Sequence, residues 1–205
     1  MGIRHTENPN QSLYMNNDYM GLPLLPNCYP YLNGYLERCR FVMLHALTRY
    51  PCVTGIRFDL HYPADYPLAD DDFNNLAVRR FIKILRERIE RDQLMASREG
   101  KRVHMTELDY VWVREFGETH RPHYHVMIFL NNQAFMSLGN PSLDHDNMAK
   151  RIRESWSKAL GVDYHIGKHR VHFPDHCSHC IHRYDQQSID NAFLALSYLC
   201  KEHSK

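Results

Sequence analysis

The chain has 205 residues, of which 43% are hydrophobic and 24% are charged, and its formal net charge is +1 at pH 7. This length and hydrophobic content suffice to bury the core of one domain. The small net charge argues against indiscriminate binding to duplex DNA, and six cysteines are too few for a dense disulfide framework. No apolar run reaches membrane-spanning length and the first ten residues lack a signal-peptide core, so we expect a cytoplasmic protein without membrane contact.

Composition and hydrophobic periodicity predict the elements in chain order. Residues 1–30 are a polar lead rich in Asn and Pro, and residues 31–205 are expected to form a single domain. The expected elements of that domain are a helix at 31–49, a strand at 52–62, a helix at 71–98, strands at 109–116 and 123–131, a helix at 142–160, a short strand at 170–173 and a helix that carries residue 198. This order predicts an α+β fold with a central antiparallel sheet, a hairpin in its middle and helices packed against it.

The most informative motif is the His-Tyr-His triplet from His123 to His125, which opens the apolar run HYHVMIFLN. On a strand both imidazoles would lie on one face and could hold one metal ion, although in a chain with 15 histidines a solvated strand face is an equal alternative. Glu115 ends the alternating run DYVWVREF, and the GETHRP segment between the runs is typical of a hairpin connection. The hairpin predicts Glu115, His123 and His125 as ligands, with Glu118 and His120 as substitutes for Glu115.

A second motif lies near the C-terminus, in SIDNAFLALSYLCKEH. Apolar residues recur there at i, i+4, i+7 and i+11 from Ile189 to Cys200, as on an amphipathic helix. Tyr198 lies off that stripe, and Lys201 three residues later would share a helical face with its hydroxyl. Alone, such a pair is more typical of a half-buried aromatic beside a solvated charge. The histidine hairpin upstream favours a catalytic pair instead.

Taken in order, these motifs resemble the HUH endonuclease superfamily, which contains the rolling-circle replication initiators. FDLHYP (58–63), PHYHV (122–126) and SYLCK (197–201) are most similar to replication proteins of the inovirus Gp2 type and related prophage proteins. The resemblance covers about residues 50–203 and depends on the order of short motifs. It implies that the two histidines and a third polar residue hold a divalent cation, and that the tyrosine cuts single-stranded DNA. FDLHYP differs from many initiators because it carries Asp and His where they have Thr or Asn.

Phosphodiester chemistry gives these residues defined roles. A phosphodiester repels nucleophiles through its negative charge, and a divalent ion on Glu115, His123 and His125 would neutralise that charge. Mixed imidazole and carboxylate ligation suits Mn²⁺ or Mg²⁺. A tyrosine hydroxyl is mostly protonated at neutral pH, so Tyr198 would need assistance, which Lys201 could give. The products would be a 5′-phosphotyrosine and a free 3′-hydroxyl, and the reaction could be reversed as strand joining.

The function predicted from the sequence is therefore a metal-dependent nickase and strand transferase that initiates rolling-circle replication of a phage or prophage-like replicon. Its partner would be single-stranded DNA at a replication origin, contacted by His61, Tyr62, His120 and Arg121, which flank the proposed metal site and offer charge and stacking. No segment matches GxxxxGK[ST], so a host helicase would act in trans. The alternatives are a relaxase or single-strand transposase with the same chemistry, or a non-catalytic DNA-binding regulator that keeps the fold.

The segment from His176 to His182 holds a further motif, a CxxC formed by Cys177 and Cys180 with flanking imidazoles. It could be half of a zinc site. It lacks a second CxxC or HxxxH at finger spacing, so a solvated loop with free thiols is the other interpretation. The sequence leaves this choice open.

Overall fold

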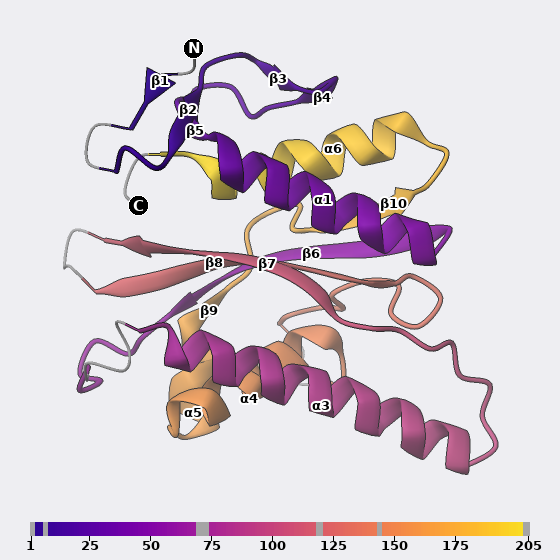
Figure 1. Cartoon of the computed structure of the whole chain (residues 1–205). Coiled ribbons are helices and arrows are strands. Elements are labelled where there is room, and N and C mark those ends of the chain that lie inside the picture. The colour runs from indigo at the N-terminus through magenta and orange to yellow at the C-terminus, as the bar shows by residue number, and fades with distance from the viewer. Residues whose placement is uncertain (1–2, 6–7, 69–73, 118–120, 143–144, 203–205) are drawn as a thin grey trace.

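The computed structural model describes residues 3–5, 8–68, 74–117, 121–142 and 145–202. Its elements form three layers, with a sheet in the middle and helices on both faces (Figure 1). Five α-helices lie in these described ranges: α1 (Asn33–Arg49), α3 (Leu76–Arg98), α4 (Met148–Leu160), α5 (Tyr164–Gly167) and α6 (Gln186–Ser197). The helices α1 and α6 cover one face of the sheet, and α3, α4 and α5 lie on the other (Figure 1). No helix of the described ranges is long and apolar enough to cross a membrane.

The central sheet is antiparallel, and the α+β class expected from the sequence is confirmed. Its five strands are β6 (Cys52–His61), β7 (Asp109–Phe116), β8 (Pro122–Asn131), β9 (Val171–His172) and β10 (Ser178–His182). They follow the order β10-β6-β8-β7, and β9 pairs with β6 next to β10. The strand β8 therefore lies inside the sheet, and its hairpin partner β7 forms one edge.

The described residues of the N-terminal lead contribute four short strands to the packed structure, and a fifth follows directly after the lead. These are β1 (Ile3–Arg4), β2 (Ser12–Tyr14), β3 (Asp18–Tyr19), β4 (Leu22–Pro23) and β5 (Tyr31–Leu32). Tyr19, Leu22 and Leu24 are buried in the same cluster as residues of α1 and α6. Tyr31 also forms an isolated antiparallel bridge with Lys201, which ties the lead to the C-terminal segment.

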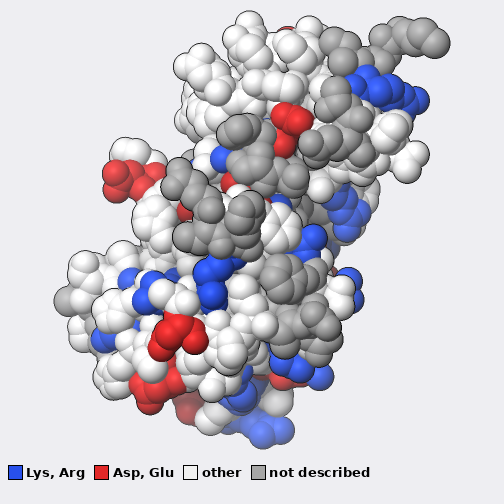
Figure 2. Space-filling model, turned by 90° about the vertical axis from the view of Figure 1, so that its left-hand side faces the viewer, with Lys and Arg blue, Asp and Glu red and all other residues white. Residues whose placement is uncertain are grey.

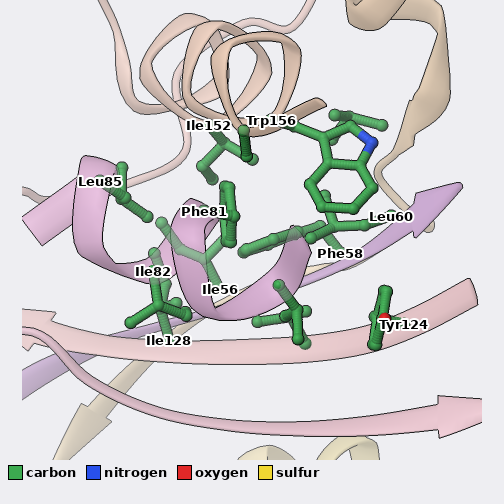
Figure 3. Close-up of a cluster of buried hydrophobic side chains, with 14 of the residues drawn as sticks. Ile56, Phe58, Leu60, Phe81, Ile82, Leu85, Tyr124, Ile128, Ile152 and Trp156 are labelled. Atoms are coloured by element: carbon green, nitrogen blue, oxygen red, sulfur yellow. The ribbon is translucent and has the colours of Figure 1, made fainter. Parts of the chain in front are cut away.

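Alternation along β6 and β8 separates two cores. Even-numbered residues from Ile56 to Leu60 and from Tyr124 to Leu130 face α3 and α4, where their side chains interlock (Figure 3). Trp156 of α4 is fully buried there, and its Nε1 donates a 2.8 Å hydrogen bond to the carbonyl oxygen of His61. Burial of each such side chain contributes about 1.5–3 kcal/mol, so this core fixes the end of β6 firmly.

The odd-numbered residues face α1 and α6, and their character changes along the strands. At one end Val53, Met127 and Phe129 are fully buried against the two helices. At the other end the same face carries His123 and His125. The second core thus ends where a row of polar side chains begins.

The structure corrects three expectations about the elements. The helix expected from residue 142 begins at Met148, because the side chain of Asn147 accepts a hydrogen bond from the Lys150 backbone N–H and caps it. Tyr198 lies in the 3₁₀-helix η2 (Tyr198–Cys200) that follows α6, not in α6 itself. The segment around Cys180 is not a loop but the edge strand β10.

Candidate functional site

The antiparallel register of the β7–β8 hairpin brings three possible metal ligands together. Glu115 lies directly opposite His123, and His125 follows two residues later on the same face. Oε2 of Glu115 lies 3.6 Å from Nε2 of His123 and 3.0 Å from Nε2 of His125. Ligand atoms of all three residues lie within 4.8 Å of one another, so the group could bind a metal ion.

Asp59 on β6 orients His125 for ligation. Nδ1 of His125 lies 2.6 Å from Oδ1 of Asp59, and because a carboxylate can only accept, Nδ1 carries the proton. The lone pair of the neutral ring is then on Nε2, which faces Glu115. This buried Nε2 is directed at the carboxylate of Glu115, whose Oε2 is 3.0 Å away. A histidine held by a carboxylate with its other nitrogen directed at further ligands is the usual arrangement at protein metal sites.

The charges of this corner favour a bound cation. Burial opposes protonation of His125, but hydrogen bonds and charge from Asp59 and Glu115 outweigh it and raise the pKa of His125. Burial also favours a neutral Asp59, yet the bond to His125 and the charge of Arg57 lower the pKa of Asp59. Positive charge stabilises the two buried carboxylates, and a metal ion would add to the charge that Arg57 and Lys201 already place beside them. The donor set fits such an ion.

Tyr198 and Lys201 reach this corner from η2 and the residue that follows it. The Tyr198 ring meets the His125 ring edge-on, with centroids 5.2 Å apart. Nζ of Lys201 donates a 3.0 Å hydrogen bond to the Tyr198 hydroxyl and lies 3.4 Å from Oε2 of Glu115. Burial opposes the charge of Lys201, but these two neighbours raise its pKa, so the ammonium stays protonated. The short sequence spacing thus places a cation on the hydroxyl.

Arg57, Asp59 and His61 complete the site, and sequence analysis missed the roles of the first two. The Arg57 guanidinium lies 4.1 Å from the centroid of the Tyr198 ring, and Nζ of Lys201 lies 4.2 Å from it. Asp59 lies opposite His125 in the β6–β8 ladder, and His61 lies opposite His123. The alternation R-F-D-L-H in β6 was the available signal, because it places all three polar residues on one face.

His172 on β9 supports the site from the outer side of β6. Its Nδ1 lies 3.3 Å from Oδ2 of Asp59, whereas His125 uses Oδ1 of the same carboxylate. Both oxygens of Asp59 therefore have imidazole partners. Local sequence patterns could not predict this contact, because β9 has only two residues and pairs with β6 from far along the chain.

A cleft of about 600 Å³ opens beside the ligand group. It is lined by His61, Tyr62, Ala64, Gly117, Arg121, Pro122, His123 and Arg170. The rings of His61 and His123 stack in it, with centroids 5.2 Å apart and planes 9° from parallel. Burial, and then the nearby His123, lower the pKa of His61, so its ring is neutral at pH 7. The cleft gives a substrate a route to His123.

Two of the residues expected to contact DNA line the cleft and also have partners within the protein. Tyr62 is only 5% exposed, and its ring packs edge-on against Trp156 with centroids 5.7 Å apart. Most of its surface is therefore covered by neighbouring residues. Arg121 donates from Nη2 to the carbonyl oxygens of Pro63 (3.0 Å) and Tyr66 (2.7 Å), which holds the loop after β6 in place.

The remaining expected residues divide between the cleft and the parts that the structure does not describe. His61 lines the cleft as expected. His120 and the possible substitute ligand Glu118 lie outside the described residues. Figure 2 shows the face of the molecule at this end of the sheet, where Lys and Arg atoms are interspersed with Asp and Glu atoms. This mixture agrees with the small net charge of the chain.

Comparisons with known proteins show which family the chain belongs to. The family model described as the YagK/YfjJ C-terminal domain matches residues 14–205. The chain belongs to the YagK/YfjJ family. It is 30% identical over 179 residues to the uncharacterized protein YagK of Escherichia coli (strain K12), covering 83% of this chain and 86% of the relative. It is 24% identical over 181 residues to the uncharacterized protein YfjJ of the same strain, covering 83% and 87%.

No solved structure matches this YagK/YfjJ chain. The names of the family and of the two relatives assign no activity. The function of the chain must therefore be argued from the residues that its fold brings together.

Proposed function

We propose that this YagK/YfjJ-family protein is a metal-dependent, single-tyrosine DNA nickase and strand transferase of the HUH type. One observation carries the proposal. A tyrosine hydroxyl and the lysine that donates to it, from the C-terminal segment, meet a Glu-His-His ligand group on the β7–β8 hairpin, which is far away in the sequence. Lys201 connects them, since its ammonium lies within 3.4 Å of both the Tyr198 hydroxyl and Glu115 Oε2. A nucleophile beside an electrophilic metal group is what cleavage of a phosphodiester requires.

Glu115, His123 and His125 would hold the metal ion, which we expect to be Mn²⁺ or Mg²⁺. Oxygen and imidazole donors without thiolate suit these ions, and Mn²⁺ tolerates nitrogen ligands better. When bound, the ion would neutralise the charge of the scissile phosphate. Asp59 would keep the proton of His125 on Nδ1, so that Nε2 stays free to bind the ion.

Tyr198 would attack the phosphorus and release the upstream part of the strand, which then ends in a 3′-hydroxyl. Its phenolic oxygen forms the new bond to phosphorus while the bond to the 3′ oxygen breaks. The proton lost by the phenol ends on the released oxygen, so the products are a 5′-phosphotyrosine and a 3′-hydroxyl. Lys201 stabilises the negative charge that develops on the phenolic oxygen. One ester replaces another, so the same residues can reverse the step and join strands.

We infer that the substrate is single-stranded DNA at a replication origin of a phage or prophage-like replicon. The cleft beside His123 leads to the ligand group, and His61 and Arg170 line it with an aromatic face and a positive charge. The net charge of +1 favours a protein that acts at a chosen site rather than along duplex DNA. Strand separation would come from a host helicase in trans.

A covalent-adduct assay tests the proposal. The protein is incubated with end-labelled single-stranded DNA and Mn²⁺, with and without chelator, and run on a denaturing gel. We expect a metal-dependent band of protein joined to DNA. Failure to form an adduct on any sequence, the cognate origin included, would favour a non-catalytic DNA-binding regulator. Adducts only on conjugative origins or transposon ends would favour a relaxase or single-strand transposase.

Peptide mapping of the adduct identifies the nucleophile. Tyr184, before α6, is a competing tyrosine that is 92% exposed. It is separated from Tyr198 by the twelve residues of α6, a rise of about 18 Å. We therefore expect the DNA-linked peptide to contain Tyr198. A linked peptide with Tyr184 would contradict the proposed site while leaving the reaction type intact.

A further inference from the structure

The end of β6 far from the catalytic corner carries a second group of ligand atoms. Cys52 lies opposite His182 in the β6–β10 ladder, and Cys180 lies two residues earlier on the same face of β10. The two sulfur atoms are 3.2 Å apart. Nε2 of His182 lies 3.7 Å from Sγ of Cys52 and 3.5 Å from Sγ of Cys180. The three residues therefore form a compact triangle of two thiols and one imidazole.

This triangle has the dimensions of a tetrahedral zinc site. With Zn–S near 2.3 Å and Zn–N near 2.05 Å, tetrahedral angles require S···N separations of about 3.6 Å and an S···S separation of about 3.8 Å. The two observed S···N distances agree with this value. The thiols need to separate by only about half an ångström, which side-chain rotation of the exposed Cys180 can provide.

The register disfavours a disulfide between the two cysteines. Cys180 lies opposite Thr54 and Cys52 opposite His182, so the cysteines are diagonal neighbours. The Cα atoms of diagonal neighbours are about 7–8 Å apart. Most disulfides join residues whose Cα atoms are only about 4.4–6.8 Å apart. Cys177 of the CxxC motif is not part of the triangle and packs beside the core formed with α3 and α4. The motif predicted from the sequence is thus replaced by a pairing between strands.

The surrounding structure holds the triangle in place before any ion binds. Arg183, next to His182, donates from Nε to the carbonyl oxygen of Leu47 (2.6 Å) and from Nη2 to that of Thr48 (3.1 Å). The backbone N–H of His182 donates to Oγ of Ser188 at 2.9 Å. These contacts fix β10 against the end of α1 and the start of α6. A preorganised set of donors loses little entropy on ligation.

We propose that Cys52, Cys180 and His182 bind Zn²⁺, with water as the fourth ligand, and that the ion fastens β10 to β6 ahead of α6. Thiolate and imidazole donors favour zinc over the ions suited to the catalytic corner. Cys52 and His61 are nine residue steps apart along an extended strand, a distance of about 30 Å, so the two sites are independent. Cys180 and His182 are exposed, which gives an ion and its water direct access.

Cobalt substitution tests the proposal separately from catalysis. The reduced, metal-free protein is titrated with Co²⁺, whose bonds to thiolate give a near-ultraviolet charge-transfer band, and Zn²⁺ is then added to displace it. We expect one equivalent of thiolate-bound Co²⁺ in the wild type. The band should be lost in Cys52→Ser and Cys180→Ser, and affinity should fall at least about tenfold in His182→Ala. It should persist in the matched control Cys177→Ser and in the catalytic variant His123→Ala.

Thermal unfolding with and without Zn²⁺ provides a second measurement. An ion that binds only the folded state raises the unfolding midpoint, and we expect this rise in the wild type and in Cys177→Ser but not in Cys180→Ser. Cys180 is exposed, so its substitution should leave the fold intact by circular dichroism. Absence of a thiolate band, retention of the band in Cys180→Ser, or a Cys52–Cys180 disulfide in the protein isolated from cells would each overturn the proposal.

Discussion

The two ends of β6 carry ligand groups of opposite character. Asp59 at one end orients His125, which with Glu115 is nearly fully buried (5% and 3% exposed), and the donors there are oxygen and nitrogen. Cys52 at the other end meets an exposed thiol and imidazole, and no carboxylate belongs to that group. The comparison shows how one antiparallel scaffold can present chemically distinct sites. Strand register brings the members of each group together. The two groups lie on opposite faces of the sheet, because side chains alternate between the faces along β6.

The largest expected effect comes from removing the nucleophile at the buried end. Tyr198→Phe deletes one oxygen and keeps the ring between its neighbours, so folding and DNA binding should persist. Adduct formation should fall by at least about a thousandfold, because no other oxygen occupies that position. A denaturing gel measures the adduct and fluorescence anisotropy measures binding. Tyr184→Phe is the matched control and should behave as the wild type; adduct formed by Tyr198→Phe at the normal rate would contradict the assignment.

Loss of a metal ligand should have the next largest effect. His123→Ala should lower cleavage about a hundredfold or more at saturating DNA, because the scissile phosphate loses charge neutralisation. His165→Ala, an exposed histidine on α5, is the control and should cleave normally. Single-turnover rates at several Mn²⁺ concentrations check this. Full cleavage by a His123→Ala, His125→Ala double variant in chelator would show that these residues are not the ligands.

Removal of the Lys201 ammonium should slow cleavage without abolishing it. Lys201→Ala leaves the phenol and the ligand group in place but removes the 3.0 Å hydrogen bond to the Tyr198 hydroxyl. We expect a loss of about tenfold to a hundredfold in the single-turnover rate, with DNA affinity little changed. A larger loss of DNA affinity than of rate would assign Lys201 to substrate binding instead.

The smallest expected effect concerns the residue that orients His125. Asp59→Asn keeps the shape of the side chain but removes its charge, and we expect Mn²⁺ affinity to fall about 10–100-fold. Cleavage should recover at high Mn²⁺, because the ligands themselves remain. His172→Ala, which removes the partner of the other Asp59 oxygen, should lower the affinity for Mn²⁺ less than Asp59→Asn does. Calorimetric titration separates these cases; equal affinity in Asp59→Asn and the wild type would remove Asp59 from the site.

Local sequence patterns were sufficient to predict those contacts whose residues lie within one element or one hairpin. The alternation in DYVWVREF and HYHVMIFLN predicted β7 and β8, and a direct hairpin left little choice of register, so Glu115, His123 and His125 could be grouped from the sequence. The three-residue spacing of Tyr198 and Lys201 likewise predicted their contact, although a 3₁₀-helix rather than an α-helix provides it.

Contacts between distant segments could not be predicted in the same way. The polar residues of β6 were visible in FDLHYP, but their partners depended on the pairing of β6 with β8 and β9. Burial of Tyr62 depended on α4, which brings Trp156 under it. The Cys52 group required β10, whose exposed side chains resemble a loop in the sequence.

The sequence by itself determined the α+β class, the hairpin with its three ligand candidates and the tyrosine–lysine pair, because periodicity and short spacing are local properties. Only the tertiary structure decided which partners surround them. It brought Asp59 within hydrogen-bond distance of His125 and the Arg57 guanidinium over the Tyr198 ring. It also showed that Cys180 lies beside Cys52 rather than forming a site with Cys177. The physical reason is that strand order and register follow from burial of the whole sheet between two helical layers, a condition that no single segment contains.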